Sequence, residues 1–333
     1  MKYVITGGSG YIGGRLIELL AQRGDAEVVI TDVRPPAKAL PHTRFVQMDV
    51  RDPGMRSLLE AERPDALVHL AFILNPLHDE QRMYSIDVNG TENVLNAAKA
   101  AGTPHVLVAS STTAYGAWPD NPVPLAEDDP VRGMPNYAYA RDKTEIDRLS
   151  QLWAAQNPDR LMTIFRPCIV FGPNVNNYLI RAWERAPFVP LIDGVDAELQ
   201  LVHEDDLVEA IAGLAIGRKA GIFNITGDGT VRFSEIASLI DVKTRRVPLR
   251  FYRRLTEVMW KLRIPRVEAP GGQVDFSHYS WVASNEKIKA ELGWEPRHTS
   301  RATLEIALRS HGLLKAGAAA ADSEYRPAAE VTS

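Results

Sequence analysis

Short apolar runs rich in β-branched residues alternate with segments of helical periodicity along the first half of the chain. The helical segment that follows the first run places its leucines on one stripe and ends at Gly24, a residue suited to terminate a helix. The runs predicted as strands are Tyr3 to Thr6, Val28 to Thr31, Phe45 to Met48, Leu67 to Ala71, Val106 to Ser110 and Met162 to Arg166. Strands that alternate with helices favour a parallel sheet covered on both faces. The predicted fold class is therefore α/β, with a doubly wound parallel sheet.

The pattern loosens after Arg166, where prolines and glycines become frequent and only one further clear strand follows, at residues 222–226. We therefore predict a main sheet domain over residues 1–166, to which the strand near 222–226 returns. A smaller, partly interleaved C-terminal lobe is predicted over residues 167–312. The Ala-rich, polar stretch over residues 313–333 has little to bury and is predicted to be a flexible tail.

Composition excludes several classes of protein. The chain has 333 residues, 45% of them hydrophobic, and a formal net charge of -4, so it can fill a large core but has no overall attraction to nucleic acid. Its single cysteine, Cys168, precludes an intrachain disulfide, and no Cys/His spacing predicts a metal site. No segment is apolar enough for an integral membrane span. We predict a cytoplasmic protein whose partner is a small molecule.

A glycine-rich turn joins the first predicted strand to the first predicted helix. Gly7, Gly10 and Gly13 have the spacing of a Rossmann-type dinucleotide fingerprint, in which the backbone closely approaches a pyrophosphate at the helix N-terminus. Asp32 ends the second strand, where a carboxylate accepts hydrogen bonds from the adenosine ribose and repels a 2′-phosphate. NAD is therefore the predicted cofactor. Arg34 keeps a minor use of NADP open, because a guanidinium can pair with that phosphate.

Tyr139 and Lys143 are four residues apart and would share one face of a helix. A tyrosine is a poor base at neutral pH, but an adjacent ammonium favours its phenolate. Such a pair can exchange a proton with a carbinol during hydride transfer. By itself this spacing is common by chance and favours an ordinary exposed helix pair.

Further motifs follow in an order that resembles one family over roughly Met1 to Arg301. They are Ser110 to Gly116, Asp65 to Ala71, Asp87 to Thr91, Pro135, Arg166-Pro167, Phe171 to Pro173, and His203 to Asp206. Together with the glycine turn and the Tyr139/Lys143 pair, they resemble the extended short-chain dehydrogenase/reductase family, of the NAD-dependent epimerase/dehydratase type. The resemblance implies that the C-terminal lobe closes over the substrate.

The resemblance also implies roles for individual residues. Ser111 would hydrogen-bond the substrate oxygen, Tyr139 would act as general acid/base, and Lys143 would hold the nicotinamide ribose and lower the pKa of the tyrosine. Asn89 matches a family position near the site, but a structural or helix-capping amide is an equal alternative. The predicted cofactor-binding residues are Gly7, Gly10, Tyr11, Ile12, Gly13, Asp32, Asp49, Val50, Leu70, Ala71, Asn89, Tyr139, Lys143 and Pro167.

Four positions bear on the reaction. Thr112 and Thr113 stand where related dehydratases carry an acidic pair, so dehydration is not expected. Ile169 and Leu199 stand where nucleotide-sugar enzymes of the family have an asparagine and an arginine, which weakens that assignment. The motif set nevertheless favours an epimerase-type enzyme on a sugar or sugar nucleotide. The alternatives are an alcohol/ketone oxidoreductase on a less polar metabolite and, in another class, a non-catalytic NAD-binding sensor or scaffold. A homodimer through the helices 89–101 and 139–156 is also expected from the resemblance.

One segment is strongly basic and amphipathic. Residues 243–266 contain nine basic side chains and a single acid, Glu257. Its apolar stripe comprises Phe251, Leu255, Val258, Met259 and Leu262. The segment is open to four interpretations: a site for an anionic substrate group, an apolar lid over a lipid-like substrate, a patch that touches a membrane, or an ordinary surface helix.

Overall fold

The computed structural model describes residues 1–315, so most of the tail predicted over 313–333 lies outside the described residues. The chain forms two compact units, and each is described separately. The first comprises Met1–Tyr115, Pro130–Arg166 and Val208–Phe223. The second comprises Gly116–Asp129, Pro167–Leu207 and the described residues from Asn224 to Lys315.

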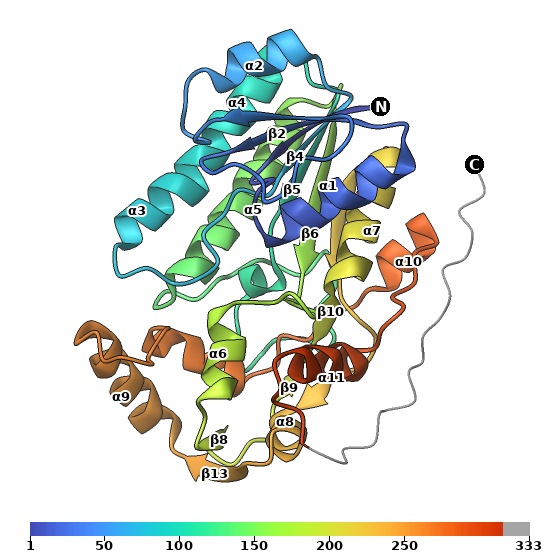
Figure 1. The fold of residues 1–333 in the computed structure, drawn as a ribbon. Helices are drawn as coiled ribbons and strands as arrows, with labels where there is room; N and C mark the ends of the chain where they lie inside the picture. Colours follow the sequence, from blue (N-terminus) through green and yellow to red (C-terminus); the bar gives the residue numbers. More distant parts are fainter. Residues whose placement is uncertain (316–333) are drawn as a thin grey trace. The chain divides into compact units, whose positions relative to one another are not determined.

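A seven-stranded sheet forms the centre of the first unit, in the order β11-β6-β5-β4-β1-β2-β3 (Figure 1). The strands are β1 (Lys2–Thr6), β2 (Glu27–Asp32), β3 (Thr43–Gln47), β4 (Ala66–His69), β5 (His105–Ala109), β6 (Leu161–Pro167) and β11 (Gly221–Ile225). All pairs from β3 through β1 to β6 are parallel. The predicted doubly wound α/β sheet is confirmed. Because the strand order reverses between β1 and β4, their carboxyl ends leave room for a ligand.

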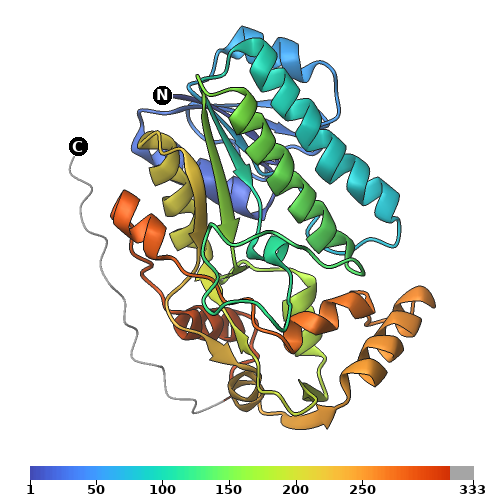
Figure 2. The same ribbon diagram turned by 180° about the vertical axis from the view of Figure 1, so that it is seen from behind.

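Helices cover both faces of this sheet, as the two opposite views show (Figures 1 and 2). On one face, α2 (Met55–Glu62), α4 (Gly90–Ala101) and α5 (Ala138–Gln156) share one apolar core with the strands. On the other face, α1 (Tyr11–Arg23) buries Leu16, Ile17 and Leu20. It ends at Gly24 with φ 73°, as the sequence predicts.

The first unit differs from the prediction after β4. This strand ends at His69, two residues earlier than predicted. The buried His69 ring hydrogen-bonds Thr6 Oγ1 at 2.6 Å and Thr91 Oγ1 at 3.0 Å, which ties β1, β4 and α4 together. Ahead of α4 lie α3 (Glu80–Tyr84) and a π-helical turn, η1 (Ser85–Asn89), where the sequence predicts one helix from Asn89.

The second unit contains three small two-stranded sheets. The pairs are β7 (Ile169–Phe171) with β10 (Leu201–His203), β8 (Phe188–Ile192) with β13 (Lys243–Val247), and β9 (Glu198–Leu199) with β12 (Val231–Arg232). Its helices are α6 (Tyr178–Glu184), α8 (Phe233–Leu239), α9 (Leu249–Lys261), η3 (Gly271–Ser277), α10 (Glu286–Leu292) and α11 (Ser300–Ser310). Helix α7 (Glu204–Ile216) begins in this unit and continues into the first.

Candidate active site

The turn between β1 and α1 is shaped for close approach of a ligand. Gly7 has φ +70°, and a Cβ on Gly13 would lie 2.3 Å from the Gly7 carbonyl oxygen. Helix α1 begins at Tyr11, and its N-cap residue, Gly10, makes no side-chain cap bond. The first-turn N–H groups at Tyr11 and Ile12 are therefore not capped by the preceding side chain. This cradle fits the pyrophosphate of a dinucleotide.

Asp32 is held at the end of β2 beside the same turn. Its Oδ2 accepts a hydrogen bond from the Ser9 backbone N–H at 3.1 Å, and its Oδ1 accepts one from the Arg34 backbone N–H, also at 3.1 Å. Each carboxylate oxygen has more than one acceptor site, so ribose hydroxyls can still donate to it. The carboxylate thus has the placement that NAD requires.

The ends of β3 and β4 bring further predicted cofactor residues to the first unit. A Cβ on Gly7 would lie 2.6 Å from the Ala71 backbone and 2.7 Å from that of Leu70, so these two residues run directly beside the cradle. Val50 is buried against Gly90. Hydrogen bonds and charge from Arg51 lower the pKa of Asp49, so its carboxylate is already occupied by an arginine.

Tyr139 and Lys143 lie on one face of α5, as their spacing predicts. The Lys143 Nζ is 6.0 Å from the centroid of the Tyr139 ring. It donates a hydrogen bond to the Ala109 carbonyl at the end of β5, at 2.7 Å, and lies 3.3 Å from the centroid of the Phe72 ring. With only 3% of its surface exposed, Lys143 is a buried ammonium beside the tyrosine.

Two opposing effects act on the Lys143 proton. Burial lowers the pKa of Lys143, whereas the carboxylates of Asp87, Asp142 and Asp147 raise it. Burial raises the pKa of Asp87, whose Oδ1 accepts a hydrogen bond from the Ile73 backbone N–H. Its Oδ2 is buried and has no hydrogen-bond partner among the described residues. Asp87 is therefore electrostatically coupled to Lys143.

Sequence reasoning selected Asn89 here and missed Asp87. Asn89 is exposed at the end of η1, and its side chain does not cap α4. Asp87 is 1% exposed. One signal was available, because Asp87 lies four residues from both Met83 and Thr91, which are also buried and so mark the inward face of the helical segment.

The turn after β5 presents Ser111. This serine is buried, and its Oγ accepts a hydrogen bond from the Thr113 backbone N–H at 3.2 Å and bonds the Thr113 hydroxyl. The short 3₁₀ segment η2 (Thr112–Tyr115) follows. Thr112 and Thr113 are buried in it, so this turn carries hydroxyl groups where the related dehydratases carry carboxyl groups.

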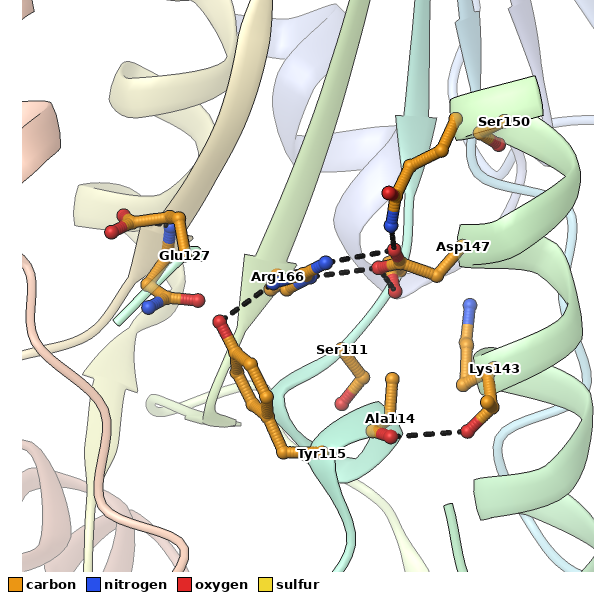
Figure 3. Close-up of polar contacts among 12 residues, drawn as sticks. Ser111, Ala114, Tyr115, Glu127, Lys143, Asp147, Ser150 and Arg166 are labelled. Carbon is orange, nitrogen blue, oxygen red and sulfur yellow. Dashed lines mark hydrogen bonds and ion pairs between the residues drawn. The ribbon is translucent and has the colours of Figure 1, made fainter. Parts of the chain in front are cut away.

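A buried ionic network lies behind this turn and was not predicted from the sequence. Arg166 of β6 donates two hydrogen bonds of 2.8 Å to the Asp147 carboxylate of α5 and a third, of 2.7 Å, to the Tyr115 hydroxyl. Ser110 Oγ donates to Asp147 at 2.6 Å. Figure 3 shows Arg166 between Asp147 and Tyr115, with Ser111 and Lys143 nearby. The network ties both ends of the Ser110–Tyr115 turn to α5 and β6.

Pro167 is the one predicted cofactor residue outside the first unit, because it ends β6 and belongs to the second. Every other predicted site residue lies within the first unit. No group of three or more His, Cys, Asp or Glu side chains among residues 1–315 is arranged to hold a metal ion. In that same part of the chain, no helix is long and apolar enough to span a bilayer.

The glycine cradle, the acidic residue at the end of β2 and the Tyr/Lys pair define a short-chain dehydrogenase/reductase of the extended type. A family model described as "NAD dependent epimerase/dehydratase family" matches residues 3–226. The chain belongs to this family, and the prediction of NAD as the cofactor is confirmed.

Similar proteins support the assignment of the chain to this family. The chain is 30% identical to UDP-glucose 4-epimerase of Erwinia amylovora over 253 residues, covering 69% of this chain and 68% of that protein. It is 27% identical to the uncharacterised protein Rv0501 of Mycobacterium tuberculosis over 320 residues, covering 93% of this chain and 84% of that protein. The structure of MoeE5 in complex with UDP-glucuronic acid and NAD has a TM-score of 0.72 at 22% identity, covering 94% of this chain and 99% of MoeE5.

Proposed function

We propose that this chain is an NAD-dependent epimerase-type enzyme that transfers hydride reversibly at a secondary alcohol carbon of a sugar or sugar nucleotide. The observation that carries the proposal is the alignment of Tyr139 and Lys143 on one face of α5, with the Lys143 Nζ bonded to the end of β5. Ser111 follows that strand by two residues. An acid/base pair in the same unit as a dinucleotide cradle is the equipment of a hydride-transfer enzyme.

In this mechanism Tyr139 accepts the hydroxyl proton of the carbinol and returns it to the ketone in the reverse direction. NAD, when bound, takes up and returns the hydride. The ammonium of Lys143 stabilises the tyrosine phenolate through its charge. Ser111 Oγ donates a hydrogen bond to the substrate oxygen and so orients it toward Tyr139.

The sugar-nucleotide part of the proposal is supported by the relatives, which include a UDP-glucose 4-epimerase and a structure with bound UDP-glucuronic acid. Two positions count against a typical diphosphate site, because the side chains of Ile169 and Leu199 have no hydrogen-bond donors and Leu199 is 5% exposed. A diphosphate would therefore need other donors of this chain. Dehydration is disfavoured in this proposal because Thr112 and Thr113 cannot act as carboxylic acids.

The apolar residues Ile169 and Leu199 favour one alternative, an NAD(H)-dependent alcohol or ketone oxidoreductase that acts on a less polar metabolite. An epimerase recycles its cofactor within each turnover, whereas an oxidoreductase must exchange it. Freshly purified protein is therefore denatured, and the released NAD is quantified by absorbance and mass spectrometry. Near-stoichiometric NAD supports the epimerase, and an empty site that binds NAD reversibly supports the oxidoreductase.

Turnover is then measured by NMR on UDP-glucose and related UDP-sugars, or, for an empty site, by NADH absorbance with alcohols and ketones. Tyr139→Phe is expected to lower kcat at least about a hundredfold while NAD affinity stays nearly unchanged, since a general acid/base contributes that much or more. Tyr84→Phe, at a tyrosine 45% exposed on α3, is the matched control. Unchanged kcat in Tyr139→Phe would refute the catalytic assignment of Tyr139. A wild-type protein that binds NAD but turns over none of these substrates would instead favour a sensor or scaffold.

We also propose that the enzyme works in the cytoplasm as a homodimer that pairs α4 and α5 of two copies. Leu152 of α5 is 54% exposed and would be covered in such a pair. Leu152→Glu should then convert a dimer to a monomer in light scattering. A wild-type protein that is monomeric at all concentrations contradicts the proposal.

A further inference from the structure

Helix α9 buries one side and exposes another that is apolar. Leu249 and Trp260 are each 8% exposed. Toward η3, Arg253 pairs with Asp275 at 2.7 Å, and the Glu257 carboxylate accepts a hydrogen bond from the Gly271 N–H at 3.0 Å. These contacts fix the inward side of the helix.

The outward side carries large apolar residues. Phe251, Leu255, Val258 and Leu262 are 60%, 40%, 47% and 67% exposed. They recur every three or four residues, so they form one stripe along the helix, opposite Leu249 and Trp260. Both ribbon views place α9 at the edge of the second unit (Figures 1 and 2).

Such a concentration of exposed apolar side chains is unusual within this chain. Twelve large hydrophobic residues are exposed in the described part of the protein, and five of them lie between Phe251 and Ile264. Single exposed apolar residues need no explanation, but a contiguous row of them marks a surface that is covered in use.

The stripe is bordered by positive charge. Arg250, Arg254 and Lys261 project from α9 between the apolar stripe and the buried side, and Arg263 and Arg266 follow the helix. In the part of the chain that the structure describes, the four arginines of this group form no ion pair, and Lys261 pairs only with Glu257. The preceding strand β13 adds the exposed residues Lys243, Arg245 and Arg246.

We infer that α9 docks this enzyme on an anionic lipid surface, with the helix lying in the plane of the interface. The stripe from Phe251 to Leu262 enters the boundary of the acyl chains, while the basic border meets the lipid headgroups. A second copy of this chain is a poorer occupant, because pairing two identical basic surfaces brings like charges together. An ordinary surface helix, one of the interpretations of residues 243–266, would bury its apolar stripe against the rest of the protein, whereas α9 leaves this stripe exposed.

The test uses the full chain in co-sedimentation with vesicles. One set contains phosphatidylcholine alone, and the other contains phosphatidylcholine with phosphatidylglycerol. The protein is expected to pellet with the anionic vesicles only, and to be released as salt screens the headgroups. No binding to anionic vesicles would overturn the inference.

Two double variants separate the charged from the apolar contribution. Arg250→Glu/Arg254→Glu should weaken binding at least about 25-fold, since each basic residue near an anionic surface contributes about a factor of five. Phe251→Ser/Leu255→Ser should weaken it at least about tenfold through lost apolar burial. Controls are Val195→Ser, at a valine of the second unit about as exposed as Leu255, and Arg56→Glu, at an exposed arginine of α2.

Thermal unfolding and NAD content check that each variant is folded. The substituted residues of α9 lie in the second unit, whereas Tyr139, Lys143 and the glycine cradle lie in the first. Binding that is unchanged in the two α9 double variants contradicts the inference, as does equal loss in the controls. If the α9 variants abolish self-association in light scattering instead, with no vesicle binding by the native protein, the occupant is a second copy and the lipid assignment is wrong. A change confined to substrate KM would assign α9 as a substrate lid and likewise overturn it.

Discussion

Replacing Asp147 by asparagine tests the buried network that supports the Ser110–Tyr115 turn. Asp147 is fully buried, and its partner Arg166 is 1% exposed, so neither charge is solvated by water. The asparagine keeps the shape of the side chain but leaves the guanidinium without its counter-ion. Arginine does not give up its proton at any ordinary pH, so the charge cannot be neutralised.

The loss of unfolding free energy expected for Asp147→Asn follows from the burial of Asp147 and Arg166. Breaking a buried ion pair by removing one partner costs about 3 to 5 kcal/mol, because the remaining charge stays desolvated and uncompensated. The matched control is Glu60→Gln in α2, where the Arg56–Glu60 pair has side chains 63% and 43% exposed. An exposed pair of this spacing contributes only about 0.3 to 0.5 kcal/mol.

The assay is urea unfolding of both variants, followed by circular dichroism at neutral pH, together with kcat and KM. Asp147→Asn should also lower kcat, because Ser110 and Tyr115 lose the anchor that holds the turn bearing Ser111. A loss of less than about 1 kcal/mol in Asp147→Asn would refute the reasoning. It would mean that water or a rearranged side chain compensates Arg166.

Three further predictions concern the cofactor and the titrating groups. Asp32→Ala should reduce the ratio of the affinities for NAD and NADP about tenfold or more, because it removes charged hydrogen-bond acceptors. Isothermal titration of both cofactors measures this ratio, and an unaltered ratio contradicts the role of the carboxylate. Asp87→Asn removes a charge that raises the pKa of Lys143, so the alkaline limb of the kcat profile should move to lower pH; an unmoved limb shows that the two groups are uncoupled. Burial and the nearby Lys143 charge lower the pKa of His69 to about 3 from 6.5, so the native state loses stability as pH falls below 6.5. Between pH 7 and pH 5 the free energy of unfolding of the wild-type protein, measured in urea, should fall by about 2 kcal/mol more than that of His69→Gln. An equal fall in the two proteins would show that the His69 ring is charged in the folded state.

Local signals along the chain were enough to predict the main sheet. The strand at residues 106–110 is observed as β5 (His105–Ala109), and the helix stop at Gly24 is observed with the expected left-handed backbone. The glycine cradle could also be predicted from a local signal, since Gly7, Gly10 and Gly13 lie within one turn of the chain. Residues that act at a distance were harder to identify. Asp87 was not selected, although its spacing from Met83 and Thr91 was a local signal, because its coupling to Lys143 depends on α5, which is remote in the sequence.

The sequence by itself determined the fold class and the cofactor, and it predicted Tyr139 and Lys143 as the acid/base pair. These depend on period-two and period-3.6 patterns, on glycines at fixed offsets and on the spacing from Tyr139 to Lys143, all of which are properties of neighbouring residues. Only the tertiary structure decided the protonation of the site and the support of its turn. Asp87, Asp147 and Lys143 influence one another because folding removes them from water, and a charge interacts strongly with its neighbours only where water is excluded. The exposed face of α9 is likewise a result of folding, because packing against η3 selects which side of an amphipathic helix is left outward.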